Sequence, residues 1–396
     1  LAREVAEKSM VLIKNEGDIL PFARSVKKVL VIGHLAKQSN TGDHGSSRIY
    51  APYVVTPLEG IERYFDGKAE ILYYGETDLE TAQRLAAEVD CVVIIAGYDF
   101  NDEGEYLIPD GDAPAATDLL SRGYRNQKMR LKAFAIKLLS RFLIPSPSSK
   151  DGAVGGDRDS LSLKPHDVRL IQQVGRINPN TAVVLVGGSA ILTKEWDDNA
   201  PAILYGWYAG MEGGNALARV LFGDVNPSGK LPFSIPMDEE HLPYFSNADD
   251  EITYDLYHGY TLLEKNQIKP AYPFVHGLSY TTWRYSDLQL RHDTDRIVVA
   301  VTLENTGNRS GEEVVQVYVG KPDSAIERQH KLLKGFEKIA LEAGQAVEVE
   351  ISVPTDELRY YDETEQCWQL ETGTYTFRVG GSCNDDELLQ LDIMLN

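Results

Sequence analysis

Apolar residues in the first half of the chain form short continuous runs separated by stretches with helical spacing. The run Cys91–Gly97 is apolar throughout and is typical of a strand buried on both faces. We expect strands over 28–33, 69–75, 91–97, 181–187 and 202–206, and helices over 1–15, 56–64, 79–89, 167–177 and 213–222. Buried strands alternating with amphipathic helices indicate an α/β layered domain with a mainly parallel sheet.

The pattern changes to strict alternation from about Trp283. Alternating apolar and polar residues predict strands over 297–303, 313–319, 347–353 and 374–379, with turns at 305–308 and 371–373. Short alternating strands at this spacing favour an all-β sandwich of about 100 residues. The stretch between the two patterns lacks periodicity and is rich in Tyr and Pro. We therefore expect an α/β domain over 1–242, an extended linker over 243–282 and a β-sandwich over 283–396.

Composition narrows the possible partners. The 396 residues carry a formal net charge of -21, which argues against nucleic acid as a partner because phosphate binding needs a cationic face. The three cysteines and eight histidines show neither a disulfide framework nor the spacing of metal ligands, so no metal or other cofactor is expected. No run is long enough for a membrane span, and no signal peptide is visible. A cytoplasmic location is slightly favoured over secretion.

One segment of opposite charge interrupts the α/β pattern at about 119–150. It holds eight basic residues and no acidic ones. Leu131, Phe134, Leu138 and Phe142 recur at three- and four-residue spacing, which predicts a basic amphipathic helix. It could dock on an acidic partner, a sister subunit or an anionic membrane. The favoured interpretation is an insertion that neutralises the chain's own acidic surface.

The strongest local candidate for chemistry is the segment Asn101–Tyr106, which follows the buried strand 91–97. Loops after strands of a parallel sheet line the binding edge of the sheet. Gly104 permits close approach of a ligand to the backbone. Carboxylates beside aromatic side chains suit sugar chemistry, although such carboxylates are more often simply solvated. Gly33-His34 lacks the glycine fingerprint of a dinucleotide site, and no serine-hydrolase elbow is present.

Several longer motifs carry a resemblance to a known family. They occur in the same order along the chain as in that family, at 2–17, 19–21, 178–181, 207–215, 221–232, 272–282, 334–336, 361–362 and 373–375. On these motifs the chain resembles glycoside hydrolase family 3 over nearly its whole length, apart from the basic insertion.

The resemblance implies a retaining β-glycosidase of the β-glucosidase or β-xylosidase type. Members have an N-terminal (β/α)8 barrel with the Asp nucleophile, then an (α/β)6 sandwich with the acid/base Glu, and then a fibronectin III-like domain. The chain matches the second and third of these. We therefore expect the barrel, with the nucleophile, on another chain or another segment, and no activity without it. Expected partners are a β-linked glycoside and that barrel, and a homo-oligomer is compatible with the sequence. The alternative is a non-catalytic carbohydrate-binding or assembly module.

The resemblance also implies site residues. Members carry the acid/base Glu in a Glu-Gly loop ahead of a Gly-Asp-Arg motif, which matches Glu103-Gly104 and 156–158 here. Glu105 flanks the same glycine and is the second candidate. Asp157 and Arg158 would touch substrate or order the loop, and a purely structural ion pair is an equal alternative. Asp43, His44 and Ser46 lie in a Gly-rich loop and are candidates for lining the same cleft.

Overall fold

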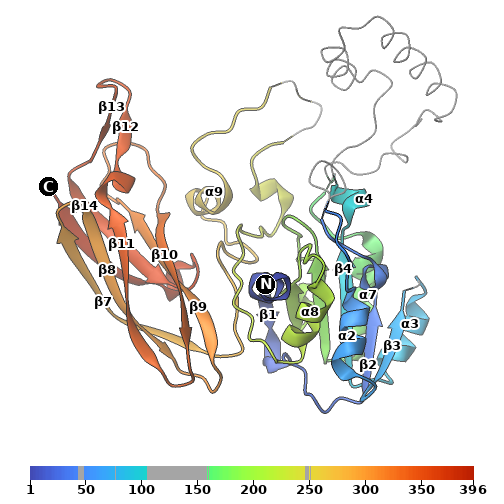
Figure 1. The fold of residues 1–396 in the computed structure, drawn as a ribbon. Coiled ribbons are helices and arrows are strands. Elements are labelled where there is room, and N and C mark those ends of the chain that lie inside the picture. Colours follow the sequence, from blue (N-terminus) through green and yellow to red (C-terminus); the bar gives the residue numbers. More distant parts are fainter. Residues whose placement is uncertain (43–48, 76, 105–157, 159, 246–248, 250) are drawn as a thin grey trace, which may run out of the picture. The chain divides into compact units, whose positions relative to one another are not determined.

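The computed structural model describes residues 1–42, 49–75, 77–104, 158, 160–245, 249 and 251–396. They fall into two compact units. The main unit comprises Leu1–Thr41, Ala51–Gly97 and Ser160–Asn396, and the second unit comprises Gly42–Tyr50 and Tyr98–Asp159. Figure 1 shows the elements of the main unit in sequence colours.

A six-stranded sheet forms the first half of the main unit in the described part of the chain. Its strand order is β1-β6-β5-β4-β2-β3. The strands are β1 (Val11–Asn15), β2 (Lys28–Ile32), β3 (Glu70–Tyr74), β4 (Cys91–Gly97), β5 (Thr181–Val186) and β6 (Ala202–Tyr205). Neighbours are parallel, except that β1 pairs antiparallel with β6. The predicted α/β layering with a mainly parallel sheet is confirmed.

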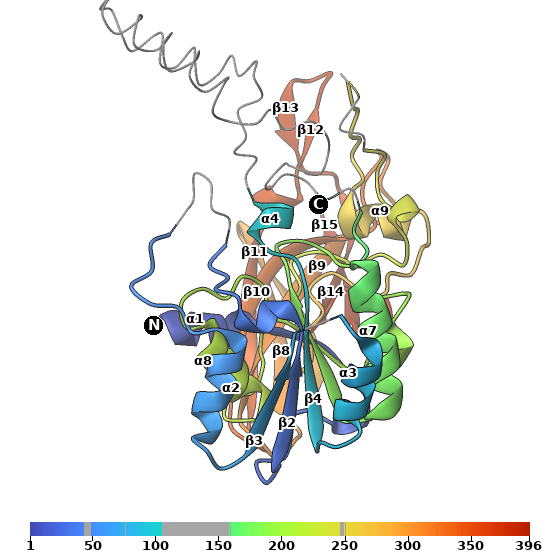
Figure 2. The ribbon, with the colours of Figure 1, turned by 90° about the vertical axis from the view of Figure 1, so that its right-hand side faces the viewer.

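Helices cover both faces of this sheet (Figure 2). On one face lie α1 (Ala2–Ser9), α2 (Pro57–Phe65) and α8 (Gly213–Leu221), and on the other lie α3 (Leu79–Ala86) and α7 (Pro165–Ile177). The start of α2 is fixed by Thr56, which accepts a hydrogen bond from the Glu59 backbone N–H while the Glu59 carboxylate accepts one from the Thr56 N–H. Because both faces are covered, every residue of β4 and β5 is buried.

Two glycines allow neighbouring strands to approach closely at the carboxyl edge of the sheet. Gly33 directly follows β2 and has a φ of 112°. Gly97 is the last residue of β4 and has a φ of 130°. A Cβ atom on Gly33 would lie 2.2 Å from the Ile95 carbonyl oxygen, and one on Gly97 would lie 2.0 Å from that of Val186. Glycine is thus required at both positions by backbone conformation and by space.

Two sequence predictions are wrong in part. The helix expected over 1–15 ends at Ser9, and Val11–Asn15 is the strand β1. Its apolar residues fit a helix period and a short buried strand equally well, and pairing with β6 decides the outcome. The stretch 243–282, expected to be extended, contains the helix α9 (Gly259–Lys265). The predicted basic helix lies outside the described residues.

The last part of the chain forms antiparallel sheets, as predicted. One has the order β10-β9-β14-β15 and another β11-β8-β7, and β12 pairs with β13 in a hairpin. The strands are β7 (Trp283–Asp293), β8 (Arg296–Asn305), β9 (Gly311–Gly320), β10 (Leu332–Leu341), β11 (Ala346–Pro354), β12 (Tyr360–Asp362), β13 (Cys367–Gln369), β14 (Gly373–Gly380) and β15 (Leu389–Leu395). Alternate residues such as Val299, Val317 and Phe377 fill the core between the sheets.

Ion pairs join this sandwich to the α/β part of the main unit. Lys230 Nζ lies 2.8 Å from Glu313 Oε1, and both side chains are buried. Glu312 is approached by Lys8 at 2.7 Å and by Lys338 at 3.0 Å. Burial alone would raise the pKa of Glu312, but the hydrogen bonds from the two lysines lower it to about 2.

The described residues contain no helix that combines the length and the apolar character needed to cross a membrane.

Candidate active site

Glu103 and Arg158, two of the residues suggested by the sequence, form an ion pair in the second unit. Glu103 is the last residue of the short helix α4 (Phe100–Glu103), which begins three residues after β4 ends. Arg158 Nε lies 2.8 Å from Glu103 Oε1, and the two side chains are only 7% and 11% exposed. Because little solvent reaches the pair, the guanidinium is a principal determinant of where the carboxylate lies.

Tyr98 supports the guanidinium from its flat side. The Arg158 Cζ lies 4.3 Å from the centroid of the Tyr98 ring, a cation–π distance, and Tyr98 is itself buried. Arginine combines a planar charged group with fixed donor directions, so one residue can stack on a ring and bind a carboxylate at the same time. The local order is therefore ring, guanidinium, carboxylate.

The start of α4 is fixed by two side-chain carboxylates, and its end by a glycine. The Asp99 carboxylate accepts a hydrogen bond from the Asn101 N–H at 2.8 Å. Asp99 and Asp102 also form a capping box, in which the Asp102 carboxylate accepts a hydrogen bond from the Asp99 N–H at 3.1 Å. At the other end, a Cβ atom on Gly104 would lie 2.2 Å from the Phe100 carbonyl oxygen. Only glycine fits there, which gives the Glu103-Gly104 sequence a steric reason.

The remaining predicted site residues lie outside the described residues. They are Glu105, Asp157, Asp43, His44 and Ser46. Their assignment to the site stays a prediction. Within the part of the chain that the structure describes, no group of three or more His, Cys, Asp or Glu side chains is arranged to hold a metal ion.

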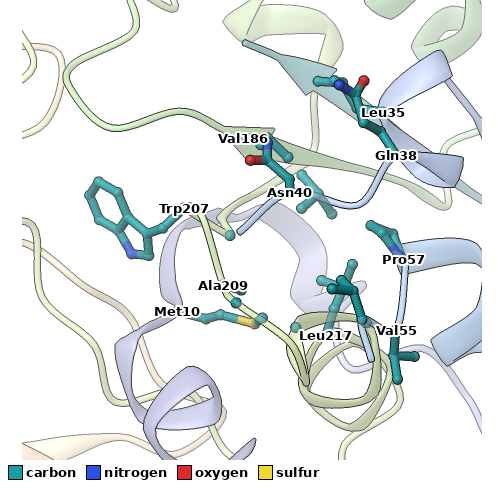
Figure 3. Close-up of a pocket in the computed structure, with 16 residues that line it drawn as sticks. Met10, Leu35, Gln38, Asn40, Val55, Pro57, Val186, Trp207, Ala209 and Leu217 are labelled. Atoms are coloured by element: carbon teal, nitrogen blue, oxygen red, sulfur yellow. The ribbon is translucent and has the colours of Figure 1, made fainter. Parts of the chain in front are cut away.

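A second feature lies at the carboxyl edge of the sheet in the main unit. A small, mainly apolar pocket opens there, and Figure 3 shows its lining. Its walls include Met10, Leu35, Val186, Trp207 and Leu217, with the amides of Gln38 and Asn40.

Trp207, at the edge of this pocket, was missed by sequence reasoning as a site residue. It follows β6 with φ of 58°, a left-handed conformation rare for a bulky residue. Its indole N–H donates to the Ser9 carbonyl at 2.8 Å, and the ring turns away from the other labelled residues in Figure 3. Residues with strained backbone conformations often lie at functional sites. The sequence gives no sign of the conformation of Trp207 beyond the glycine that precedes it.

Asp167, at the start of α7, is a further buried carboxylate that the sequence did not reveal. The Gly97 N–H at the end of β4 points to its Oδ2 at 3.5 Å. Burial raises the pKa of Asp167, and the hydrogen bond from Gly97 opposes this only partly. Asp167 thus helps to hold the end of β4, which directly precedes the segment with α4 in the sequence.

Comparison with known proteins gives the class of molecule to which this fold belongs. The glycosyl hydrolase family 3 C-terminal domain matches residues 10–280, and the fibronectin type III-like domain matches residues 313–383. The first match covers more than half of the chain, so the chain belongs to glycosyl hydrolase family 3. The fold class that the resemblance implied is confirmed, with an α/β domain followed by a fibronectin III-like one.

Individual relatives agree with this assignment. Thermostable beta-glucosidase B of Acetivibrio thermocellus is 31% identical over 97% of this chain and 47% of its own length. Probable beta-glucosidase I of Aspergillus oryzae is 29% identical over 96% of this chain and 61% of its own length. The chain therefore spans about half of the length of such relatives.

Solved structures show the same arrangement. A family 3 beta-glucosidase of Bifidobacterium adolescentis superposes with a TM-score of 0.79 at 27% identity, covering 100% of this chain and 52% of that one. Beta-glucosidase 3B of Thermotoga neapolitana, solved with glycerol, gives 0.76 at 26% identity, covering 100% and 53%. A glucohydrolase of Trichoderma reesei matches in fold, with a TM-score of 0.83 at 23% identity, covering 100% and 55%.

Proposed function

We propose that this chain supplies the general acid/base of a retaining β-glycosidase, and that Glu103 is that residue. The observation that carries the proposal is the buried ion pair of Glu103 and Arg158, with Glu103 at the end of a capped helix that begins three residues after a central strand. Membership of the family adds the reaction class, and its Glu-Gly loop matches Glu103-Gly104.

The proposed substrate is a β-glucoside. The support is that the relatives named above are beta-glucosidases, although the chain spans only about half of their length. In a retaining reaction, Glu103 would first protonate the glycosidic oxygen as the aglycone leaves. The same residue would then take a proton from the water that attacks the glycosyl-enzyme intermediate.

The second carboxyl group would come from outside this chain. Retention requires two carboxyl groups about 5–5.5 Å apart, one as nucleophile and one as acid/base. In the family the nucleophile is an Asp on an N-terminal barrel, and about half of the length of the relatives has no counterpart here. We therefore expect the chain alone to be inactive and the chain combined with the barrel to hydrolyse β-glucosides.

Arg158 has a positioning role in this proposal. The Arg158 guanidinium, 2.8 Å from Glu103 Oε1, would help to fix the orientation of the carboxylate in the site. Stacking on the Tyr98 ring holds the plane of the Arg158 guanidinium in place. Glu105 remains the alternative acid/base, since it flanks the same glycine.

The test compares Glu103→Gln and Glu105→Gln in the barrel-containing protein with aryl β-glucosides of different leaving-group acidity. Removing the acid/base lowers turnover of poor leaving groups by about 10²–10⁴-fold. Turnover of a dinitrophenyl glucoside falls much less, because that leaving group needs no proton. Added azide should restore the activity of Glu103→Ala on the dinitrophenyl glucoside. The product should be the β-glucosyl azide, because azide attacks the glycosyl-enzyme without a general base.

The outcome separates the three possibilities. If Glu105→Gln shows the leaving-group dependence and Glu103→Gln does not, the acid/base is Glu105. If neither variant discriminates between leaving groups, both assignments fail, and the chain is a non-catalytic carbohydrate-binding or assembly module. Correct folding of each variant is checked by its thermal unfolding temperature.

A further inference from the structure

The hairpin of β12 and β13 carries two exposed aromatic side chains on one face. Figure 1 shows this hairpin projecting from the two larger sheets of the sandwich. Tyr361 and Trp368 are direct cross-strand partners, with ring centroids 5.6 Å apart and ring planes at 70°. Their exposed fractions are 48% and 63%. Because opposite residues of a strand pair share a face, the two rings form one aromatic surface, here called the aromatic pair.

The other face of the hairpin is held to the sandwich. The Arg328 guanidinium lies 5.1 Å from the centroid of the Tyr360 ring and donates from Nη1 to the Leu358 carbonyl at 3.1 Å. Arg328 also lies 3.3 Å from Glu371, next to the start of β14. Anchoring of one face fixes the position of the other, so the aromatic pair is presented in a set orientation. A partner that binds it meets little cost of ordering the site.

The charge around the aromatic pair points to an uncharged ligand. Acidic residues lie around the pair in sequence at 356, 357, 362, 363 and 365, and of these Asp356 is bound to Arg359 at 2.7 Å and Glu357 lies 3.7 Å from Lys334. A second copy of this chain, with its net charge of -21, would be repelled. An anionic ligand would be repelled for the same reason. A neutral molecule would not, and one rich in hydroxyls could donate hydrogen bonds to these carboxylates.

We propose that Tyr361 and Trp368 form a binding surface for a neutral β-linked glucan. The axial C–H groups of a β-linked pyranose make an apolar face that stacks on an aromatic ring, while its hydroxyls point outward to polar groups. The choice of glucan rests on the proposed function, since the polymer held would be the polymer cleaved. The surface uses none of the residues assigned to the reaction.

The test is affinity electrophoresis of the full protein in native gels with and without a soluble neutral β-glucan. Wild-type migration is retarded by the glucan, and Trp368→Ala or the double variant Trp368→Ala/Tyr361→Ala weakens binding about tenfold or more. Trp368→Phe keeps an aromatic face and most of the retardation. The matched control is Phe336→Ala, because Phe336 on β10 is 65% exposed and lies outside the hairpin. It should migrate like wild type.

Several outcomes would overturn the proposal. Wild type could pass unretarded, the alanine variants could remain retarded, or Phe336→Ala could lose retardation equally. A Trp368 indole inaccessible to acrylamide quenching in the full protein would show that another part of the protein covers it. Loss of self-association in Trp368→Ala, without any effect of glucan, would assign the surface to a second copy.

The proposed catalytic function can fail separately. Trp368→Ala should hydrolyse a small aryl β-glucoside at the wild-type rate, because such a substrate is too short to need a second surface. The variant Glu103→Gln should hydrolyse glucosides slowly, but its migration should still be retarded by glucan. If Glu103 proves not to be the acid/base, the retardation experiment still decides whether the aromatic pair binds glucan.

Discussion

Arg158 Nε lies 2.8 Å from Glu103 Oε1, although the whole basic insertion separates the two residues in sequence. The contact links the Glu-Gly loop to the Gly-Asp-Arg motif. Both side chains are largely buried, so each charge depends on the other for compensation.

This relationship predicts the effect of changing Arg158. In the barrel-containing protein, Arg158→Ala should lower kcat about tenfold or more with little change in KM, because the carboxylate loses its fixed orientation. Arg158→Lys should restore little, since an ammonium group cannot both stack on Tyr98 and bind in a fixed direction. The measurement is steady-state kinetics on cellobiose and on a dinitrophenyl glucoside. The defect should be larger on cellobiose, and an equal defect on both would contradict a role through Glu103.

Gly97→Ala should destabilise the protein strongly. Its φ of 130° is unfavourable for alanine, and the added Cβ would lie 2.0 Å from the Val186 carbonyl oxygen. We expect a loss of about 3 kcal/mol or more in the free energy of unfolding. Gly344→Ala is the matched control. That residue has φ of 75° with open space around its Cβ, and the substitution should cost only about 1 kcal/mol. Urea unfolding measures the loss in free energy of unfolding of each variant. The difference between the two losses gives the cost of the steric clash at Gly97, beyond the cost of the backbone conformation.

The link between Glu312 and its two lysines should make stability depend on acidity. Because folding lowers the pKa of Glu312 from its ordinary value of 4.5 to about 2, its stabilisation is complete above pH 4.5 and is lost as the pH falls toward 2. Solvent screening at this partly exposed group limits the effect to about 1 kcal/mol. Glu312→Gln should therefore be less stable than wild type at pH 6 and equal to it near pH 2.

Urea unfolding at several pH values measures this difference. Glu348→Gln, at an exposed position of β11, is the control and should follow wild type throughout. A constant difference between Glu312→Gln and wild type across this pH range would mean that packing, not charge, accounts for the loss.

The buried pair of Lys230 and Glu313 should show strong coupling. Lys230→Met alone leaves the Glu313 carboxylate buried without its cation and should cost about 3–5 kcal/mol. Adding Glu313→Gln should recover a large part of that loss, because no net charge then remains buried. The free energies of the two single variants and the double variant form a cycle whose coupling is the measurement. Additive single effects would show that the ion pair contributes nothing of its own.

Much of the fold follows from the local sequence pattern. The continuous apolar run Cys91–Gly97 became a strand with every residue buried, and the alternation at 297–303 became part of β8. Val11–Asn15 was predicted as helix because its pairing partner in β6 is remote in sequence. Helix α9 is short, and its seven residues, about two turns, give little periodicity to detect.

The candidate site was less accessible to sequence reasoning. Glu103 and Arg158 were suggested by resemblance to a family and not by spacing, since no local pattern shows that residues on either side of an insertion touch. The stacking of Tyr98 under Arg158 depends on three-dimensional geometry alone. Asp167 and Trp207 were missed because burial and backbone strain are properties of the folded chain.

The antiparallel pairing of β1 with β6 has a consequence for how the chain is made. Val11 pairs with Tyr205, so during synthesis β1 waits for β6, the last strand of this sheet in chain order. At about 5–20 residues per second, that interval is on the order of 10–40 s. During this time Val11, Leu12 and Ile13, all buried in the finished sheet, have no partner strand. Until β6 is made, the apolar segment 11–13 is therefore an aggregation-prone stretch of the nascent chain.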